Sequence, residues 1–500
     1  MTPYYITTAI PYVNATPHLG HALELIQADV LARHRRLRGQ PVRYLSGTDD
    51  HALKNVLAAR AAGEPVADFV SRAADRFEAL QDVLQLSCDD YLRTSSDVRH
   101  RPGVEYLWRR CAEAGDFYRQ TYTGLYCVGC EQFYEPDALV GGRCPEHGTE
   151  PEQVSETNWF FRLSRYGERI RDAISSGAIT INPVQKRNEV LALLDRGLQD
   201  FSVSRPAERA DGWGIPVPGD PSQVIYVWWD ALANYLTALR VDRRGEDYRR
   251  WWAGHGDRVH VIGKGITRFH AVYWIGLLLS AGEPLPTTIH VHDYVNVGGL
   301  KLSKSTGNVV DPVNLVETYG VDALRWWITR EVPLLGDTEF TVERLVQAYN
   351  TDLANGLGNL ANRTATLLHK YYEGKLCVDN DVVKGSNWDS TALDAACAAL
   401  PANVDAALST ADFRAATAHL VATVNLANQL LNAAEPWKTV KTPDADPHLI
   451  HRLLSRVAGT CRTITTELTP LCPRGATRLS AQLGNGSHLA APAPPFARLA

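Results

Sequence analysis

The 500-residue sequence has almost no methionine, since Met1 is the only one, and it has only nine cysteines. So few cysteines exclude a small secreted domain held together by disulfides. No apolar run reaches the roughly 18 residues of a membrane span, and no basic residue precedes Arg33, so we expect no secretory signal. The net charge is −5, from 51 basic and 56 acidic side chains, which excludes a histone-like polycation but not a local basic surface. We expect a cytoplasmic enzyme without a membrane segment.

The first fifty residues show the order strand, helix, strand. Residues 2–14 are β-branched and aromatic, 18–39 carry apolar residues at helical spacing, and 41–51 predict a second strand. This βαβ pattern implies a parallel sheet, whose ligands bind at the carboxyl ends of the strands. Further strand-like runs are predicted at residues 224–230, 258–265 and 288–299. The fold class is therefore α/β, with a Rossmann-like catalytic domain.

Four metal-binding side chains occur in two close pairs, Cys127 with Cys130 and Cys144 with His147. Three sulfurs and one imidazole at this spacing close a tetrahedral Zn²⁺ site and leave no position for a catalytic water. The sequence therefore predicts one structural Zn²⁺ in an insertion too small for a core of its own. We expect the remaining cysteines to be core thiols: Cys88, Cys111, Cys377, Cys397, Cys461 and Cys472.

The residue composition changes twice along the rest of the chain, and these changes predict domain boundaries. From about residue 117 the sequence is rich in glycine, cysteine, tyrosine and short turns, which indicates an insertion, and after residue 349 it becomes rich in alanine and leucine, which indicates an all-α domain. We expect a first half of the catalytic domain at 1–116, a connective insertion with the zinc knuckle at 117–223, a second half at 224–320, a linking region at 321–349, a C-terminal all-α domain at 350–475 and an extended tail at 476–500.

Two short motifs are suited to phosphate. His18, Gly20 and His21 stand where the first strand turns into the first helix, whose N-terminal N–H groups attract anions. The segment from Lys301 to Lys304 follows two glycines and supplies mobile positive charge. Either motif alone is as typical of a solvent-exposed turn as of a phosphate-binding site. The two motifs together on a parallel-sheet domain indicate a nucleotide-binding site. The expected ATP-binding residues are His18, Gly20, His21, Lys301, Ser303 and Lys304.

These motifs resemble a known family. HLGH and KLSKS are similar to the signatures of class I aminoacyl-tRNA synthetases, and AIPYVNATPHLGH, GTDDH, YVWWDALANY, IGKGITRFH and KLSKSTGNVVDP resemble segments of the methionyl-tRNA synthetase family, over residues 4–437. The resemblance implies ATP-dependent activation of L-methionine to methionyl-adenylate, with Mg²⁺ bound to ATP, and transfer to the 3′ end of elongator and initiator tRNA(Met). It implies His18, His21, Lys301 and Lys304 as catalytic residues.

The resemblance also implies further site residues. Asp49 matches the acid that binds the substrate ammonium group, and Arg205 matches an arginine that supports the active site. The methionine pocket is expected from Ile10, Tyr12, Asp49, Trp228, Ala231, Leu232, Tyr235, Ile266 and His270. Asn359, Arg363 and Trp437 match positions that read the anticodon, and single-stranded bases do stack on aromatic rings.

The chain departs from the family pattern at three positions around the expected nucleotide and substrate sites. Gly265 stands where the family commonly has an aspartate near the ATP ribose, Ala52 replaces a usual glycine, and Asp50 replaces a glutamate. Because the helical domain is followed by little further sequence, we expect a monomer.

Three other functions would account for parts of this pattern. A cysteine-specific synthetase would hold its substrate thiol on zinc, but the Cys127 knuckle has no open position. A non-catalytic tRNA-binding paralogue is expected to lose HLGH, KLSKS or Asp49, and all are present. A small-molecule nucleotidyltransferase would not need the helical domain with Trp437.

Overall fold

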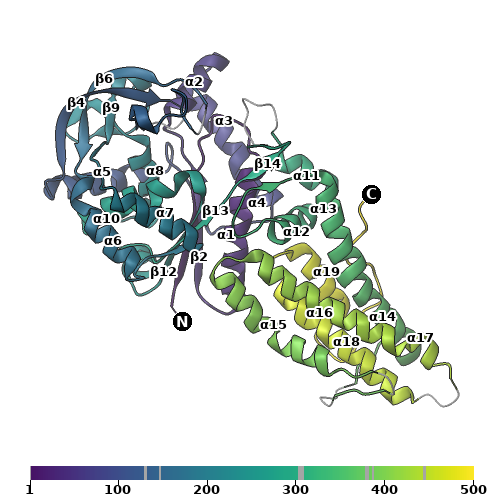
Figure 1. Ribbon diagram of the computed structural model, residues 1–500. Coiled ribbons are helices and arrows are strands. Elements are labelled where there is room, and N and C mark those ends of the chain that lie inside the picture. The colour runs from purple at the N-terminus through teal and green to yellow at the C-terminus, as the bar shows by residue number, and fades with distance from the viewer. Residues whose placement is uncertain are drawn as a thin grey trace. The chain divides into compact units, whose positions relative to one another are not determined.

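The computed structural model describes residues 2–128, 132–145, 148–301, 309–377, 382–385, 388–442 and 446–500 (Figure 1). The chain forms two compact units, the first made of Met1–Asp82 and Leu86–Asp293, the second of Val83–Gln85 and Tyr294–Ala500. Along the sequence, the main boundary between the units therefore falls after Asp293, and the finer division expected from composition stays a prediction. Within the described residues, no helix is both long and apolar enough to cross a membrane.

A six-stranded sheet forms the centre of the first unit, in the order β3-β2-β1-β12-β13-β7, with every neighbouring pair parallel. The strands are β1 (Tyr4–Thr8), β2 (Val42–Thr48), β3 (Asp90–Arg93), β7 (Thr180–Asn182), β12 (Asp257–Gly263) and β13 (Thr288–His292). All five residues of β1 are buried, as expected for a central parallel strand covered on both faces. The predicted parallel α/β sheet is confirmed.

Helices of the first unit connect these strands. They are α1 (Leu19–Leu37), α2 (Leu53–Ala62), α3 (Val66–Glu78), α4 (Leu80–Val83), α5 (His100–Glu113), α6 (Gly167–Ser175), α7 (Val184–Asp195), α8 (Val227–Thr237), α9 (Glu246–Tyr248) and α10 (Trp274–Ala281). A π-helix, Phe269–Tyr273, leads into α10. The helix expected over residues 18–39 is confirmed as α1.

The strand predicted at residues 224–230 is wrong. The strand β11 (Asp220–Ile225) ends there, and α8 begins at Val227. Every residue of α8 except Trp228 is buried, including the polar Asp230, Asn234 and Thr237. Because almost no part of this helix is exposed to solvent, its sequence lacks the alternation of apolar and exposed polar residues that marks a surface helix, and it resembles a buried strand.

The insertion is built on an antiparallel sheet in the order β5-β4-β6-β8. Its strands are β4 (Phe117–Cys127), β5 (Gln132–Tyr134), β6 (Glu152–Phe161) and β8 (Phe201–Ser202), and a smaller sheet follows, with β9 (Ser204–Pro206), β10 (Pro216–Val217) and β11. The insertion is not continuous over 117–223, however. Between β6 and β8 of the antiparallel sheet, the chain returns to the main sheet, where β7 pairs with β13.

The second unit is mainly helical, as predicted. Its helices are α11 (Pro312–Tyr319), α12 (Val321–Glu331), α13 (Val342–Ala348), α14 (Asn359–Tyr372), α15 (Thr391–Ser409), α16 (Phe413–Ala434), α17 (Pro436–Thr439), α18 (Pro447–Leu468) and α19 (Pro473–Leu483). Figure 1 shows α14, α16 and α18 packed as neighbours. A short sheet joins β14 (Val295–Val297), β15 (Leu300–Lys301) and β16 (Thr338–Glu339).

The expected extended tail begins later than predicted. The helix α19 continues to Leu483, past the boundary placed at residue 475, and only residues 484–500 lack regular helix or strand. This tail is not loose, because Phe496 is buried and its ring packs beside Gly475. Apolar burial against α19 and backbone hydrogen bonds together hold this segment, since the Leu489 N–H donates to the Gly374 carbonyl at 2.9 Å and the Ala490 N–H to the Gln482 carbonyl at 3.0 Å.

Candidate active site

The two histidines of HLGH cap the first helix. His18 is the N-cap of α1, and its Nδ1 accepts the N–H of Gly20 at 3.1 Å, while the Nδ1 of His21 accepts the N–H of His18 at 3.1 Å. The imidazoles stack with ring centroids 3.8 Å apart. Burial and the neighbouring imidazole hold the pKa of His21 well below its usual range, so this ring is neutral. With both Nδ1 atoms accepting, each neutral ring carries its proton on Nε2.

Gly20 is needed for this arrangement. A Cβ at this position would lie 2.9 Å from Cε1 of His18. A larger residue would therefore displace the capping ring.

Asp49 lies at the carboxyl end of β2, beside the end of β1. It forms an isolated parallel bridge with Tyr12, and its N–H donates to the carbonyl of Pro11 at 2.9 Å. The Asn55 amide donates to the carbonyls of Asp49 and Asp50 at 3.0 and 2.9 Å. Only 1% of Asp49 is exposed, so its carboxylate is shielded from water, which strengthens its interaction with a charged partner. The structure thus brings Tyr12 and Asp49 together.

Aromatic rings gather next to Tyr12. Trp228 stacks on Phe269, with centroids 3.8 Å apart and planes 5° apart, and meets Tyr12 and His270 edge-on at 6.3 and 6.4 Å. Three of the expected methionine-pocket residues are therefore grouped. The sequence analysis missed Phe269, although it precedes His270 within a segment already singled out.

A hydrogen-bonded chain fixes His270. Its Nδ1 donates to the carbonyl of Ile266 at 3.0 Å, and its Nε2 accepts the hydroxyl of Tyr235 at 2.7 Å. Burial lowers the pKa of His270 to about 4, so the ring is neutral at physiological pH. Ala231 and Leu232 are buried on the same helix as Tyr235, and the Ile10 side chain lies close to Gly47 of β2. These five side chains are apolar or neutral, which suits a thioether.

The departures at Ala52 and Gly265 have different consequences. Ala52 has φ −62°, an ordinary value for any residue, so no glycine is required there. Gly265 lies in the short turn Lys264–Ile266 at the end of β12 and supplies no carboxylate. In the adjoining strand end, Asp293 lies 3.7 Å from the Lys264 ammonium.

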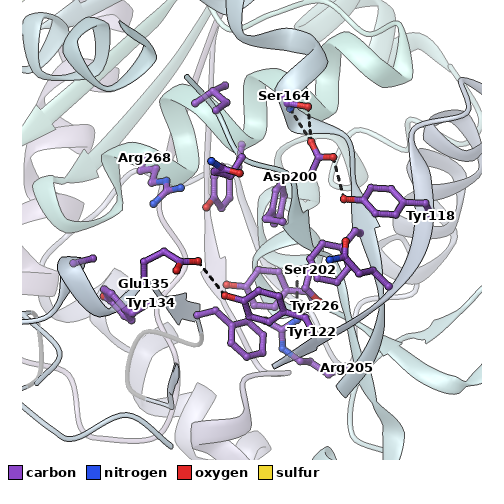
Figure 2. A pocket seen from close by; sticks show the side chains of 18 of the residues that line it. Tyr118, Tyr122, Tyr134, Glu135, Ser164, Asp200, Ser202, Arg205, Tyr226 and Arg268 are labelled. Carbon is purple, nitrogen blue, oxygen red and sulfur yellow. Dashed lines mark hydrogen bonds between the residues drawn. The ribbon is translucent and has the colours of Figure 1, made fainter. Parts of the chain in front are cut away.

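Arg205 is buried in the insertion, where its Nη1 donates to Ser202 Oγ and to the Ser204 carbonyl, each at 2.8 Å. Its guanidinium lies 4.3 Å from the ring centroid of Tyr226. Arg205 lines a cavity of about 540 Å³ together with aromatic side chains such as Tyr122 (Figure 2). None of the nine expected methionine-pocket residues lines this cavity, so a supporting role for Arg205 stays a prediction.

The expected zinc ligands are only partly described. Cys127 and Cys144 are both buried, and both adjoin Thr149: the Cys127 Sγ is 3.8 Å from its hydroxyl, and the Cys144 N–H donates to its carbonyl at 2.9 Å. Cys130 and His147 lie outside the described residues. Among the residues that are described, no group of three or more possible ligands gathers around one point, so the prediction is not tested.

The second phosphate motif is also partly outside the described residues. The backbone of Lys301 pairs with Asn296 in the hairpin of β14 and β15. Ser303 and Lys304 are not among the described residues.

Two of the three expected anticodon residues adjoin each other. The guanidinium of Arg363 lies 5.1 Å from the ring centroid of Trp437, a cation–π contact between α14 and α17. Asn359 is exposed one turn before Arg363 on α14. An arginine and a tryptophan at one surface are suited to unpaired bases.

Comparison with known proteins agrees with this geometry. Residues 4–153 and 147–365 match the family model described as tRNA synthetases class I (M). The chain belongs to the class I methionyl-tRNA synthetases. The methionine–tRNA ligase of Brucella melitensis is 39% identical over 516 residues, covering 99% of this chain and 98% of the relative. That of Mycobacterium tuberculosis (strain H37Rv) is 38% identical over 501 residues, covering 98% and 93%.

Solved structures of the same family are also similar. The Mycobacterium tuberculosis methionyl-tRNA synthetase in complex with methionyl-adenylate superposes with a TM-score of 0.93 at 37% identity, covering 100% of both chains. The apo form of that enzyme superposes with a TM-score of 0.86 at 34% identity, covering 100% of this chain and 98% of the other. The family therefore shares the Rossmann-like catalytic unit and the C-terminal helical region.

Proposed function

We propose that this chain activates L-methionine with ATP and transfers it to the 3′ end of tRNA(Met). The observation that carries the proposal is the buried Asp49 carboxylate next to Tyr12, with Trp228 and His270 behind it. Sulfur interacts favourably with the edges of aromatic rings, and a buried carboxylate attracts an ammonium group. Both ends of a methionine molecule therefore have a complementary partner.

In the first step, a carboxylate oxygen of methionine attacks the α-phosphorus of ATP, and pyrophosphate leaves with the electron pair of the broken P–O bond. Both reactants are anions, so the protein must align them and stabilise charge on the phosphate oxygens. Because Nδ1 of each ring accepts a capping hydrogen bond, Nε2–H of His18 and His21 would donate to these oxygens. Lys301 and Lys304 would neutralise the β- and γ-phosphates, and Mg²⁺ would arrive with ATP.

In the second step, a hydroxyl of the terminal ribose of tRNA attacks the carbonyl carbon of methionyl-adenylate, and AMP leaves. Asn359, Arg363 and Trp437 would select tRNA(Met) through its anticodon, for both elongator and initiator species. The contact between Arg363 and Trp437 supports this assignment because both groups can stack on unpaired bases.

One Zn²⁺ would be held by Cys127, Cys130, Cys144 and His147. The chemistry of this donor set fits zinc, and the burial of the two described thiols next to Thr149 supports it. With four protein ligands the metal would tie the turns of the insertion together and take no part in the reaction. A monomeric state and a cytoplasmic location stay predictions of the sequence.

The test is ATP–pyrophosphate exchange with each of the twenty amino acids, in the absence of tRNA. Exchange with methionine alone is expected. Exchange with another amino acid would contradict the pocket assignment, and exchange with none would contradict activation itself.

A further inference from the structure

A buried carboxylate joins two segments of the methionine site that are far apart in sequence. Asp230 follows Trp228 by two residues on α8, and both of its oxygens are engaged: Oδ2 accepts from Nδ1 of His51, and Oδ1 accepts from Nε2 of His100, each at 2.5 Å. His100 and Asp230 have at most 1% of their side chains exposed, and His51 has 10%. His51 follows Asp49 by two residues.

Asp230 is ionised, and both imidazoles donate to it. Although burial opposes charge, the two imidazoles hold the pKa of Asp230 well below its usual range. Burial also opposes protonation of His51, but Asp230 outweighs this and raises the pKa of His51. A carboxylate that accepts two charge-assisted hydrogen bonds in a buried setting is held rigidly.

His51, Asp230 and His100 form a hydrogen-bonded bridge, and both of its ends are held by further contacts. The Nδ1 of His100 bonds at 2.8 Å to Oγ1 of Thr237, which lies two residues after Tyr235 on α8. On the loop that carries Asp49, the ring of His51 meets Trp213 edge-on at 5.8 Å, and the Trp213 indole donates to the Asp50 carbonyl at 2.8 Å. His51 is therefore held by contacts with both the loop that carries Asp49 and the helix α8.

We propose that His51 is a positioning residue that, through Asp230 and His100, sets the separation between the ammonium-binding Asp49 and the aromatic wall carried by α8. This inference rests on the proposed function and deepens it. The substrate spans these two groups, with its ammonium at one end and its thioether at the other. A bridge between them therefore determines how well methionine fits, while contacts to ATP stay unchanged.

The test uses the full chain with His51→Leu, which removes the donor to Asp230, and His51→Gln, whose amide can still donate. For His51→Leu we expect the Kd for methionine, measured without ATP by tryptophan fluorescence, and the KM for methionine to rise about tenfold. The kcat of ATP–pyrophosphate exchange and the KM for ATP are expected to stay within threefold. His51→Gln is expected to restore methionine binding to within threefold of the unsubstituted chain.

A matched control separates positioning from general destabilisation. Ser280→Ala removes a buried hydrogen bond to a different aspartate, Asp116, at 2.7 Å, and should leave the Kd for methionine unchanged. The proposal is overturned if His51→Leu binds methionine normally, or if its Kd for methionine and KM for ATP rise together. It is also overturned if His51→Gln binds as weakly as His51→Leu. A chain that binds methionine with this pattern but exchanges no pyrophosphate would contradict the proposed function and leave the positioning role intact.

Discussion

His18 shows how one side chain combines a structural and a chemical role. Its Nδ1 accepts a backbone N–H at the start of α1, as the side chain of a helix cap does, and this places the proton of the neutral ring on Nε2. The hydrogen bond that holds the ring thus also determines which nitrogen carries the proton. The same holds for His21, whose Nδ1 accepts from the backbone of His18.

Substitution of His18 by asparagine should separate the two roles. The Asn oxygen can replace Nδ1 as the cap, but no donor remains at the position of Nε2. We expect kcat of pyrophosphate exchange to fall about 100- to 1000-fold, the loss typical of a removed transition-state donor, with nearly unchanged thermal stability. His18→Ala should lose activity to a similar extent and also lose about 1 kcal/mol of stability with the cap. Full activity of His18→Asn would contradict a role for Nε2–H.

At the scale of elements, the packing of α5 on α8 brings His100 to Asp230. Gly103, one turn after His100, allows this close approach, because a Cβ there would lie 2.5 Å from Cγ2 of Thr237. The two helices therefore contact each other at the backbone of α5, which keeps the buried hydrogen bonds short.

Gly103→Ala should accordingly destabilise the protein. Overpacking at this contact is expected to cost about 1–3 kcal/mol in the free energy of unfolding, measured by urea denaturation. Gly459→Ala on α18 is the matched control: its Cβ would meet nothing within 4 Å, and it should stabilise the helix by about 0.5–1 kcal/mol. Equal effects of the two substitutions would refute the close packing of α5 on α8.

The insertion offers a second test at this scale. The purified chain is expected to release one equivalent of Zn²⁺ to a chromogenic chelator after denaturation, and Cys127→Ser is expected to release much less, because a zinc site loses affinity with a thiolate ligand. Cys111→Ser is the control, since this thiol is buried near the Leu277 carbonyl and should not bind metal. Full zinc content in Cys127→Ser would exclude the proposed ligand set.

For the whole molecule, activation and tRNA recognition should be separable because they depend on different units of the chain. Trp437→Ala in α17 is expected to raise the KM for tRNA(Met) at least tenfold, since stacking on an aromatic ring contributes about 1–3 kcal/mol per base. Pyrophosphate exchange, which needs no tRNA, should stay unchanged. Trp388→Ala replaces another half-buried tryptophan of the second unit and should leave both activities intact. If Trp437→Ala charges tRNA(Met) with the normal KM, the anticodon assignment is wrong.

The stability of the whole protein should fall in mild acid. Burial lowers the pKa of His21, His260, His270 and His290, and the last two are lowered to about 4. As pH falls below about 6.5, the unfolded chain binds protons at these histidines and the folded chain does not, so the free energy of unfolding decreases. We expect a loss of about 1 kcal/mol per histidine between pH 7.5 and 5.5, partly offset by His51, whose pKa is raised.

Urea denaturation at the two pH values measures this difference. His290→Gln removes one of these four histidines. The decrease in the free energy of unfolding between pH 7.5 and 5.5 should therefore become smaller by about 1 kcal/mol. The exposed His255 provides the control, since His255→Gln should leave the pH dependence unchanged. Equal stability at pH 7.5 and 5.5 would contradict neutral burial of these histidines.

The sequence by itself determined the parallel α/β unit, the helical second unit and the residue types of the site. These features are local: HLGH spans a strand-to-helix turn, and the pattern of apolar residues in the first fifty positions reflects one strand and one amphipathic helix. Tyr12 and Asp49 could be placed together because the carboxyl ends of neighbouring parallel strands meet at one edge of the sheet.

Only the tertiary structure decided the features that depend on burial and long-range contacts. The helix α8 is buried except at Trp228, so its sequence resembled a strand, and nothing near β7 in the sequence indicates that it pairs with β13. The stack of Trp228 on Phe269 and the bridge from His51 through Asp230 to His100 join segments 41 to 179 residues apart. Side-chain packing and buried charge select such contacts, and the spacing of residues along the chain does not encode them.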